Sequence, residues 1–558
     1  MAWAIVVDGG PPENLHKSPF ERMAPYAGRL FTGVMQRNTR GSHGLERRAP
    51  NVYPCTVEHV EVCLDAFDGT GPVVVLANRE PVRHDRAADG SIVVKRSASG
   101  LVTALEPLIE ACSGVWVAHG AGTADDVVVD RRDGLNVPPA SPRYRLRRVW
   151  LSRKEERGYY YGFSNEGLWP MCHRAHVQPM FRSEDFDAYR VVNARFAEAV
   201  HDEVESESPL ILVQDYHFAL APQAIRERLP LSTIVAFWHI PWPHPRDYDV
   251  CPWGRELLEG LLGSTILGFQ TPEDCENFVD TVEAVLDAHI DRGRRVITYG
   301  DRQVTVRAYP VSIEWPNRWA CQSPPVDTCR AVVRRQLPPG ARLAVGVDRL
   351  DYTKGIDEKF LAVERLLELH PEFREHFVFV QVAEPSRDGL AAYQAYRSRL
   401  VKTLDRVNLR FGTERYRPLV LIEAHYEPSE VYQLLRAADV CWVGSLHDGM
   451  NLVAKEFVAA RDDNSGVLML SQFTGAAREL SDAVLVNPYA IDACAQALAE
   501  ALTMTREEQA RRMGAMRAVV AQFNAYRWVV EILTDAAHLR ANRELHRQTD
   551  WPAHSIPA

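Results

Sequence analysis

The chain has 558 residues, of which 46% are apolar and 25% charged, the usage of a globular protein with two or three domains. Its formal net charge of -10 excludes a general nucleic-acid-binding protein, because such proteins need a basic excess to neutralise the phosphate backbone. No apolar run approaches the roughly 18–20 residues that span a bilayer, and the ten cysteines show no zinc-binding spacing, so we expect a cytoplasmic protein.

Residues 1–70 are expected to form an N-terminal extension that is partly disordered. Pro, Gly, Arg and His are frequent through about residue 54, and the apolar residues show little periodicity. No basic leader precedes the short apolar run at the N-terminus, which argues against a signal peptide. We assign no function to this segment.

A first series of short apolar runs begins at Pro72 and predicts a domain over residues 71–315. Probable helices separate many of the runs, and this alternation is typical of a parallel sheet covered by helices. Gly100 is placed to open one helix with its backbone close to a ligand. The predicted strands are Val73–Arg79, Val115–Ala118, Leu210–Gln214, Thr233–Trp238 and Thr265–Phe269.

A second series of the same kind predicts a domain over residues 316–545, which includes the helical region after about residue 490. The irregular, Pro-rich stretch 315–339 is the expected linker, and residues 546–558 are the expected tail. The fold class is therefore α/β, with two Rossmann-like, doubly wound domains that face each other across a cleft. The predicted strands are Leu343–Val347, Phe377–Val382, Leu419–Ile422, Val440–Val443, Val467–Leu470 and Ala483–Val486.

Polar residues directly follow or closely trail apolar strands at four places in the first half. They are Asn78-Arg79, Ser99-Gly100, Asp215-Tyr-His217 and His239-Ile-Pro-Trp-Pro243. Each has a structural alternative, such as a capping Asp, a core His or a turn stiffened by proline. Open α/β sheets bind ligands at the carboxyl ends of their strands, so four such segments together predict a binding site there.

The segment Gly346–Gly355 places Arg349 and Lys354 between a strand and a helix. There the two cations are suited to hold a diphosphate and to stabilise it as it leaves. The alternative is a surface salt bridge with Asp348 or Asp351. Neither a Walker motif nor a G-x-G-x-x-G after the first strand is present, which disfavours P-loop and classical dinucleotide chemistry.

The segment Gly444–Ala460 is the most informative part of the chain, because it predicts a strand, a turn at Gly449 and a helix. The free N–H groups at such a helix start attract phosphate. Asp448 can accept hydrogen bonds from a neutral polyol, and Glu456 lies roughly 7–8 Å along the helix axis, at the offset of a ribose. The pattern predicts a nucleotide sugar as ligand, although turn and capping chemistry alone would use similar residues.

Taken together, the motifs between about Val73 and Trp528 resemble those of the trehalose-6-phosphate synthases. These are retaining glycosyltransferases with two Rossmann-like halves, the GT-B fold. The resemblance rests on Ala77-Asn-Arg79, Tyr160 through Trp169-Pro170, Gln214-Asp-Tyr-His217, Trp238–Pro243, Gly346–Gly355, Leu446–Glu456 and Leu470–Ala477. It implies transfer of glucose from UDP-glucose, or another nucleotide diphosphate glucose such as GDP-glucose, to glucose 6-phosphate, giving α,α-trehalose 6-phosphate.

The resemblance also implies a role for each matching residue. Arg349 and Lys354 would hold the donor diphosphate and Glu456 the ribose. Asp448 would bind the transferred glucose, and His239 would contact it near its 6-hydroxyl and the reacting centre. The catalytic set is then His239, Arg349, Lys354 and Asp448, with Gly100, Gly449, Met450, Asn451 and Leu452 completing the donor site. The acceptor pocket would comprise Arg79, Tyr160, Trp169, Asp215 and Arg406.

Within that pocket, Arg79 and Arg406 would take the 6-phosphate. Neither a metal nor a cofactor is expected, because Arg349 and Lys354 supply the positive charge that a cation would otherwise bring. The expected partners are the two substrates, with no nucleic acid and no membrane, and homo-oligomerisation is left open.

Three positions depart from the family pattern. His119 stands where the family has a tryptophan near the acceptor, His447 replaces an arginine, and Ser99-Gly100 replaces Gly-Gly. Two alternatives therefore stay open: a glucosylglycerol-phosphate synthase that uses glycerol 3-phosphate, and a catalytically silent regulatory subunit. Retention of Arg349, Lys354, Asp448 and Glu456 argues against the silent subunit.

Overall fold

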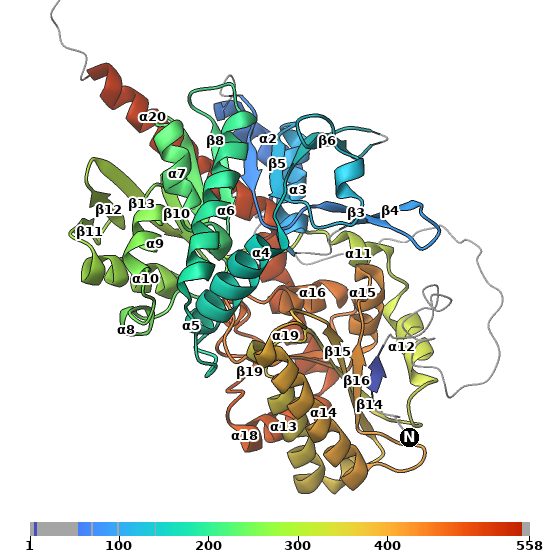
Figure 1. Cartoon of the computed structure of the whole chain (residues 1–558). Helices are drawn as coiled ribbons and strands as arrows, with labels where there is room; N and C mark the ends of the chain where they lie inside the picture. Colours follow the sequence, from blue (N-terminus) through green and yellow to red (C-terminus); the bar gives the residue numbers. More distant parts are fainter. Residues whose placement is uncertain (1–4, 8–53, 68–70, 97–99, 140, 550–558) are drawn as a thin grey trace, which may run out of the picture.

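The structure is a computed structural model that describes residues 5–7, 54–67, 71–96, 100–139 and 141–549 (Figure 1). Two large sheets follow one another along the chain, each flanked by helices. This arrangement confirms the predicted α/β class with two doubly wound halves. No helix in the described ranges is long and apolar enough to cross a membrane.

The first half is built on a ten-stranded sheet with the order β11-β12-β13-β10-β9-β8-β2-β5-β7-β6. Its central strands are parallel, and the pairs β6–β7, β11–β12 and β12–β13 at the edges are antiparallel. The strands are β2 (Val74–Leu76), β5 (Val115–His119), β6 (Gly134–Val137), β7 (Tyr144–Val149), β8 (Leu210–Gln214), β9 (Thr233–Phe237), β10 (Ile266–Phe269), β11 (His289–Asp291), β12 (Val296–Tyr299) and β13 (Arg302–Ala308).

Helices cover this sheet, and a short hairpin projects from it. The hairpin is formed by β3 (Val82–Arg86) and β4 (Ile92–Arg96). The helices are α3 (Gly100–Ala111), α4 (Arg153–Glu156), the π-helix η4 (Arg157–Leu168), α5 (Trp169–His173), α6 (Ser183–Asp202), α7 (Ala221–Arg228), α8 (Pro245–Tyr248), α9 (Gly254–Leu261) and α10 (Pro272–Val285), with the 3₁₀ turns η3 (Asp125–Val127) and η5 (Tyr216–Phe218).

The second half is built on a seven-stranded sheet in which each strand pair is parallel. The order is β1 (Ile5–Val7), β16 (Leu419–Glu423), β15 (Phe377–Glu384), β14 (Arg342–Arg349), β17 (Val440–Val443), β18 (Val467–Ser471) and β19 (Val484–Val486). The helices are α11 (Arg318–Gln322), α12 (Val326–Arg334), α13 (Ile356–Leu369), α14 (Ala391–Phe411), α15 (Pro428–Ala437), α16 (Leu452–Ala460), α17 (Ala476–Glu479), α18 (Ile491–Thr503) and α19 (Arg506–Gln522), with the 3₁₀ turns η6 (Tyr352–Lys354) and η7 (Pro371–Phe373).

Each sheet reverses its strand order at one point. In the first sheet the reversal lies between β2 and β8, and in the second it lies between β14 and β17. The loops that follow two such strands diverge to opposite faces, and this leaves a crevice at the carboxyl ends. The binding site is therefore expected at the ends of these four strands.

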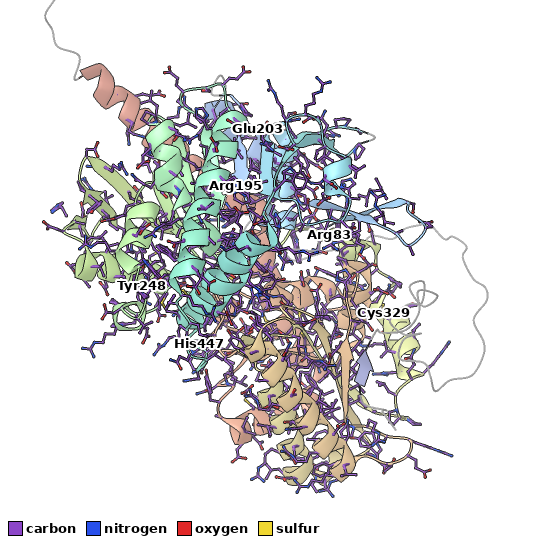
Figure 2. All side chains as sticks on the ribbon, viewed as in Figure 1. Arg83, Arg195, Glu203, Tyr248, Cys329 and His447 are labelled. Atoms are coloured by element: carbon purple, nitrogen blue, oxygen red, sulfur yellow. The ribbon has the colours of Figure 1, made fainter. Side chains whose placement is uncertain are left out.

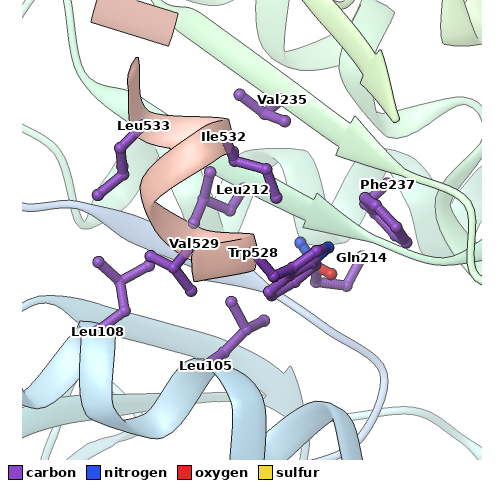
Figure 3. A pocket seen from close by; sticks show the side chains of 10 residues that line it. All are labelled: Leu105, Leu108, Leu212, Gln214, Val235, Phe237, Trp528, Val529, Ile532 and Leu533. Carbon is purple, nitrogen blue, oxygen red and sulfur yellow. The ribbon is translucent and has the colours of Figure 1, made fainter. Parts of the chain in front are cut away.

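The last helix, α20 (Ala525–Thr549), leaves the second half and returns to the first (Figure 1, red). Trp528, Val529, Ile532 and Leu533 pack against α3 and against β8 and β9 (Figure 3). Farther along, Arg540 and Arg543 donate hydrogen bonds to groups at the starts of β8, β9 and β10. The prediction that all terminal helices belong to the domain 316–545 is therefore wrong for α20, because its apolar face is buried on the other sheet.

Part of the predicted N-terminal extension also belongs to the fold. The helix α2 (Val57–Leu64) lies against α20 and α3, with Val60 and Phe67 buried. The side-chain amide of Asn524 donates to the carbonyl of Cys55 at 3.0 Å. The strand β1 of the same segment pairs with β16, and residues 546–549 of the predicted tail belong to α20. The expected disorder in residues 1–4, 8–53 and 68–70, and the rest of the tail, lie outside the described residues.

We predict that Trp528→Ala lowers the free energy of unfolding by about 3–5 kcal/mol, the usual cost of removing a buried aromatic side chain. Trp528 is 2% exposed, donates through Nε1 to the carbonyl of Tyr309 at 3.1 Å and packs edge-on against Phe237. Urea denaturation measures the change. The control Leu409→Ala removes a side chain that is 86% exposed and should stay within about 0.5 kcal/mol of wild type. Equal midpoints for both variants would contradict the proposed packing role of α20.

Candidate functional site

A cavity of about 640 Å³ lies between the two halves, large enough for a nucleotide-sized ligand. Its walls are formed by the loops after β2, β8 and β9 in the first half and after β14, β15 and β17 in the second. The side chains that line it include Asn78, Arg79, Tyr160, Trp169, Asp215, His239, Arg349, Lys354, Arg387, Asp448, Asn451 and Glu456. Thus most of the residues predicted from strand ends meet in one cavity, at the points where the two sheets reverse their strand order.

Asp215 ends β8 in a strained conformation. Its φ of 76° and ψ of 169° lie in a region that residues other than glycine rarely adopt. The strain lets one carboxylate oxygen accept hydrogen bonds from its neighbour Tyr216 N at 2.9 Å and from His239 N at 3.2 Å. Burial raises the pKa of Asp215 to about 6, although these two N–H groups oppose the shift. Asp215 therefore ties two adjacent strand ends together and still lines the cavity.

An aromatic wall lies beside Asp215. The π-helix η4 carries Tyr160, whose ring stacks on His217 with centroids 5.5 Å apart, and it leads directly to Trp169. Wide helical turns of this kind are frequent at functional sites. Trp169 is 4% exposed, and the guanidiniums of Arg387 and Arg349 lie 4.2 and 5.1 Å from its ring centre. Such a surface suits the apolar face of a sugar ring.

Three guanidiniums act on the Tyr160 hydroxyl. Burial by itself raises the pKa of this phenol, but the positive charges of Arg387, Arg79 and Arg349 outweigh burial and hold the pKa below its ordinary value. One arginine comes from the first half and two from the second. Their convergence makes this end of the cavity a site for anions.

Arg387 is a cavity residue that the sequence analysis did not identify. It follows β15, is 9% exposed, and donates to Asp351 Oδ2 at 3.1 Å and to Tyr216 Oη, in the other half, at 3.3 Å. Its place in the loop that follows the predicted strand Phe377–Val382 is the signal that could have identified it.

The prediction that Arg406 lies in the acceptor pocket is wrong. Arg406 projects from α14, its side chain is 54% exposed, and it forms an ion pair with Glu364 at 2.7 Å. It is not among the residues that line the cavity. The short match that suggested it lies within a helix on the outer side of the sheet.

Lys354 and Asp448 form the centre of the second wall. Lys354 Nζ lies 2.6 Å from Asp448 Oδ2, and Ser445 Oγ and Asn451 Nδ2 each donate to the same oxygen at 3.1 Å. Burial would raise the pKa of Asp448, but the Lys354 ammonium holds it below its ordinary value. Neither Arg349 nor Lys354 forms the alternative ion pair with Asp348 or Asp351, since Lys359 pairs with Asp348 at 2.6 Å and Arg387 pairs with Asp351 at 3.1 Å.

The helix α16 begins at the cavity, as the sequence predicts. Asn451 caps it from a φ of 85° and accepts a hydrogen bond from Ala454 N at 3.3 Å. Met450, Leu452 and Glu456 line the cavity, and burial raises the pKa of Glu456 to about 7. Gly449 is needed for close approach, because a Cβ there would lie 2.2 Å from the carbonyl oxygen of His239. Gly100 begins α3, whose Val102 and Glu106 line the cavity, and Ser99 lies outside the described residues.

The other two departures from the family pattern lie outside the cavity wall. His119 Nδ1 is 3.1 Å from the carbonyl oxygen of Val149. His447 lies where the two halves meet (Figure 2), beside the ring of Phe473 at 5.2 Å, and burial lowers its pKa to about 4. Neither histidine is among the lining residues.

Comparison with known proteins agrees with this geometry. The model of the family described as Glycosyltransferase family 20 matches residues 71–538. A trehalose-6-phosphate synthase of Mycolicibacterium vanbaalenii is 38% identical over 477 residues, which cover 84% of this chain and 96% of that protein. One of Mycobacterium tuberculosis is 36% identical over 488 residues, covering 86% and 97%.

Solved structures give the same result. A structure from E. coli bound with UDP-2-fluoro glucose is 31% identical, with a TM-score of 0.75, and covers 84% of this chain and 99% of its own. An α,α-trehalose-phosphate synthase (UDP-forming) from Burkholderia xenovorans, in complex with glucose-6-phosphate, is 32% identical with a TM-score of 0.72, covering 84% and 100%. These findings confirm the resemblance that the motifs indicated.

We predict that Asp215→Asn stabilises the fold by about 1–2 kcal/mol at pH 8, an effect reduced by the 21% exposure of the side chain. The folded-state pKa of about 6 lies above the unfolded value, so the protonated acid stabilises the fold at low pH and this contribution is lost as pH rises through 6. The gain should therefore vanish near pH 4. Urea denaturation at both pH values measures it, with Asp327→Asn, whose side chain is 98% exposed, as control. A gain that does not change with pH would contradict the pKa shift.

Proposed function

This chain belongs to glycosyltransferase family 20, and from that premise we propose that it transfers glucose from UDP-glucose, or another nucleotide diphosphate glucose, to glucose 6-phosphate. The product is α,α-trehalose 6-phosphate, formed with retention of configuration. The observation that carries the proposal is one cavity in which cations from both halves converge beside an aromatic wall. Both substrates bear phosphate, and a single cavity lined by cations of both halves suits them.

The donor lies along the second half. Arg349 and Lys354 bind its diphosphate, assisted by the amides at the start of α16. Glu456 binds the ribose, and Asp448 binds hydroxyls of the glucose that is transferred. Asp448 pairs with Lys354 at 2.6 Å, so the group that holds the sugar also fixes the ammonium that meets the phosphates.

The acceptor lies against the first half. Arg79 and Arg387 bind the 6-phosphate, and Asp215 orients the sugar by accepting a hydrogen bond from a hydroxyl. Tyr160 and Trp169 cover the ring face. Glycerol 3-phosphate has no ring to cover this aromatic surface, so the cavity favours the hexose phosphate.

Catalysis follows from charge placement. As the bond to the leaving diphosphate breaks, negative charge develops on its oxygens, and Arg349 and Lys354 stabilise it without the cost of reorganising water. The leaving phosphate then accepts the proton of the attacking hydroxyl on the same face of the sugar. Burial lowers the pKa of His239, which lines the cavity, to about 3, so this histidine supplies no proton.

A catalytically silent role does not suit this site, since Lys354, Asp448 and Glu456 line one cavity with buried or half-buried side chains.

We further propose that the enzyme works in the cytoplasm, because both substrates are anions that do not cross a bilayer unaided.

We predict that Arg387→Ala raises the KM for glucose 6-phosphate by on the order of 10–100-fold, the effect of losing a charged hydrogen bond to phosphate. The KM for UDP-glucose should change less than about threefold. A coupled assay for released UDP measures both constants. Arg406→Ala is the matched control and should leave both unchanged, because that arginine pairs with Glu364 outside the cavity. A rise in the KM for glucose 6-phosphate in Arg406→Ala alone would indicate that the phosphate binds at α14.

We predict that Lys354→Ala lowers kcat by on the order of 100-fold or more, because the leaving diphosphate loses its closest ammonium. The same assay measures the change. Lys402→Ala removes an exposed lysine of α14 and should retain wild-type kcat. Turnover near the wild-type value in Lys354→Ala would exclude the leaving-group role.

A further inference from the structure

His239 is held at the cavity by two glutamine side chains from the neighbouring strands. It follows β9, Gln214 ends β8, and Gln270 follows β10, so three adjacent strand ends deliver these three side chains. The Nε2 atom of His239 lies 2.9 Å from Gln214 Oε1, and its Nδ1 atom lies 3.4 Å from Gln270 Nε2. Both glutamines are 2% exposed. The ring therefore has a protein partner at each nitrogen.

A backbone group sets the polarity of this chain of hydrogen bonds. The N–H of Val311 donates to Gln270 Oε1 at 3.0 Å. A backbone N–H can only donate, so the oxygen of Gln270 must face Val311 and its NH₂ group must face His239. The same NH₂ group also lies 3.4 Å from the carbonyl oxygen of His239, an acceptor. The amide of Gln270 has only one orientation that satisfies all three contacts.

The tautomer of His239 follows from that orientation. An NH₂ group can only donate, so Nδ1 must accept and carries no proton. The single ring proton of the neutral imidazole is then on Nε2, where it donates to Gln214 Oε1. A second proton, on Nδ1, would point at the NH₂ group of Gln270, donor against donor.

Within the described part of the chain, no carboxylate forms a hydrogen bond or ion pair with the ring of His239. Asp215 accepts from the backbone N–H of His239 and not from the ring. The other titratable neighbour is His217, a buried ring whose own pKa is held well below the ordinary value, mainly by burial. The remaining contacts are aromatic: Phe237 of β9 at 4.4 Å and Trp528 of α20 at 6.4 Å between ring centres. Figure 3 shows Trp528 and Phe237 beside Gln214.

We propose that Gln214 and Gln270 are positioning residues that lock His239 as the neutral Nε2–H tautomer during glucosyl transfer. The inference rests on the proposed function. Positive charge develops at the anomeric carbon of the transferred sugar as the donor bond breaks. An imidazolium beside that carbon would repel the developing charge, whereas a neutral ring with both nitrogens engaged does not. Gln214 and Gln270 thereby keep the imidazole of His239 uncharged.

The test is Gln270→Glu. Glutamate has the same shape and still accepts from Val311 N–H, but it places an acceptor where wild type has a donor, so Nδ1 can be protonated. We expect kcat at pH 6 to fall on the order of 10-fold or more and to recover as pH rises, while both KM values change less than about threefold. Because Asp215 and Glu456 also titrate in this range, the quantity to compare is the ratio of variant to wild-type kcat at each pH, and this ratio should rise with pH. Gln303→Glu adds the same charge on an exposed part of β13 and should behave as wild type.

A second measurement needs no variant. Nitrogen-15 NMR of histidine-labelled wild-type protein distinguishes the two tautomers and the charged ring, with the signal of His239 assigned by its loss in His239→Asn. We expect the Nε2–H tautomer from pH 6 to 8, and an Nδ1–H or doubly protonated ring would overturn the proposal. An active enzyme whose Gln270→Glu variant keeps the wild-type pH profile would also overturn it. Absence of glucosyl transfer by wild type would refute the proposed function and leave the NMR result to decide the tautomer.

Discussion

The convergence of cations from both halves on one cavity is the interaction on which the site depends. Arg79, Arg349, Arg387 and Lys354 line one cavity, and the acids that pair with this set are Asp351 and Asp448. Lys354 and Arg387 are buried and held by these acids, whereas Arg349 is partly exposed and Arg79 is exposed. Together the four cations provide the affinity for both substrates and the stabilisation of the leaving group.

Two residues beside the same cavity have a strained backbone conformation. Asp215 and Asn451 both have a positive φ although neither is glycine, and each directs a polar side chain to the cavity rim. Strain of this kind persists only where the surrounding structure determines it. Here the parallel strands on either side supply that rigidity. Gly449 lies so close to His239 that the two halves meet through backbone atoms, which leaves no room for solvent at that point.

Each side of the cleft has a charge state that suits the charge developing next to it during the reaction. The second half presents cations where negative charge develops on the leaving phosphates. The first half holds His239 neutral where positive charge develops on the sugar. The helix α20 connects the two halves. It continues from the second half, and the ring of its Trp528 packs near the ring of His239 in the first half. Each half thus contributes the electrostatic environment that its portion of the reaction requires.

The sequence alone determined the architecture and most of the cavity. Alternating apolar runs and helices predict two doubly wound sheets, and polar residues directly after strands identify Arg79, Asp215, His239, Arg349 and Asp448, because position along a parallel strand fixes which edge a residue occupies. Tertiary structure decided the rest. Arg387 and not Arg406 enters the cavity, since the loop after β15 points to the cleft and α14 lies outside it. The destination of α20 and the tautomer of His239 depend on contacts between residues far apart in the chain, such as Val311 with Gln270. Periodicity reports only which face of an element is apolar, and not which partner covers it or which atom carries a proton.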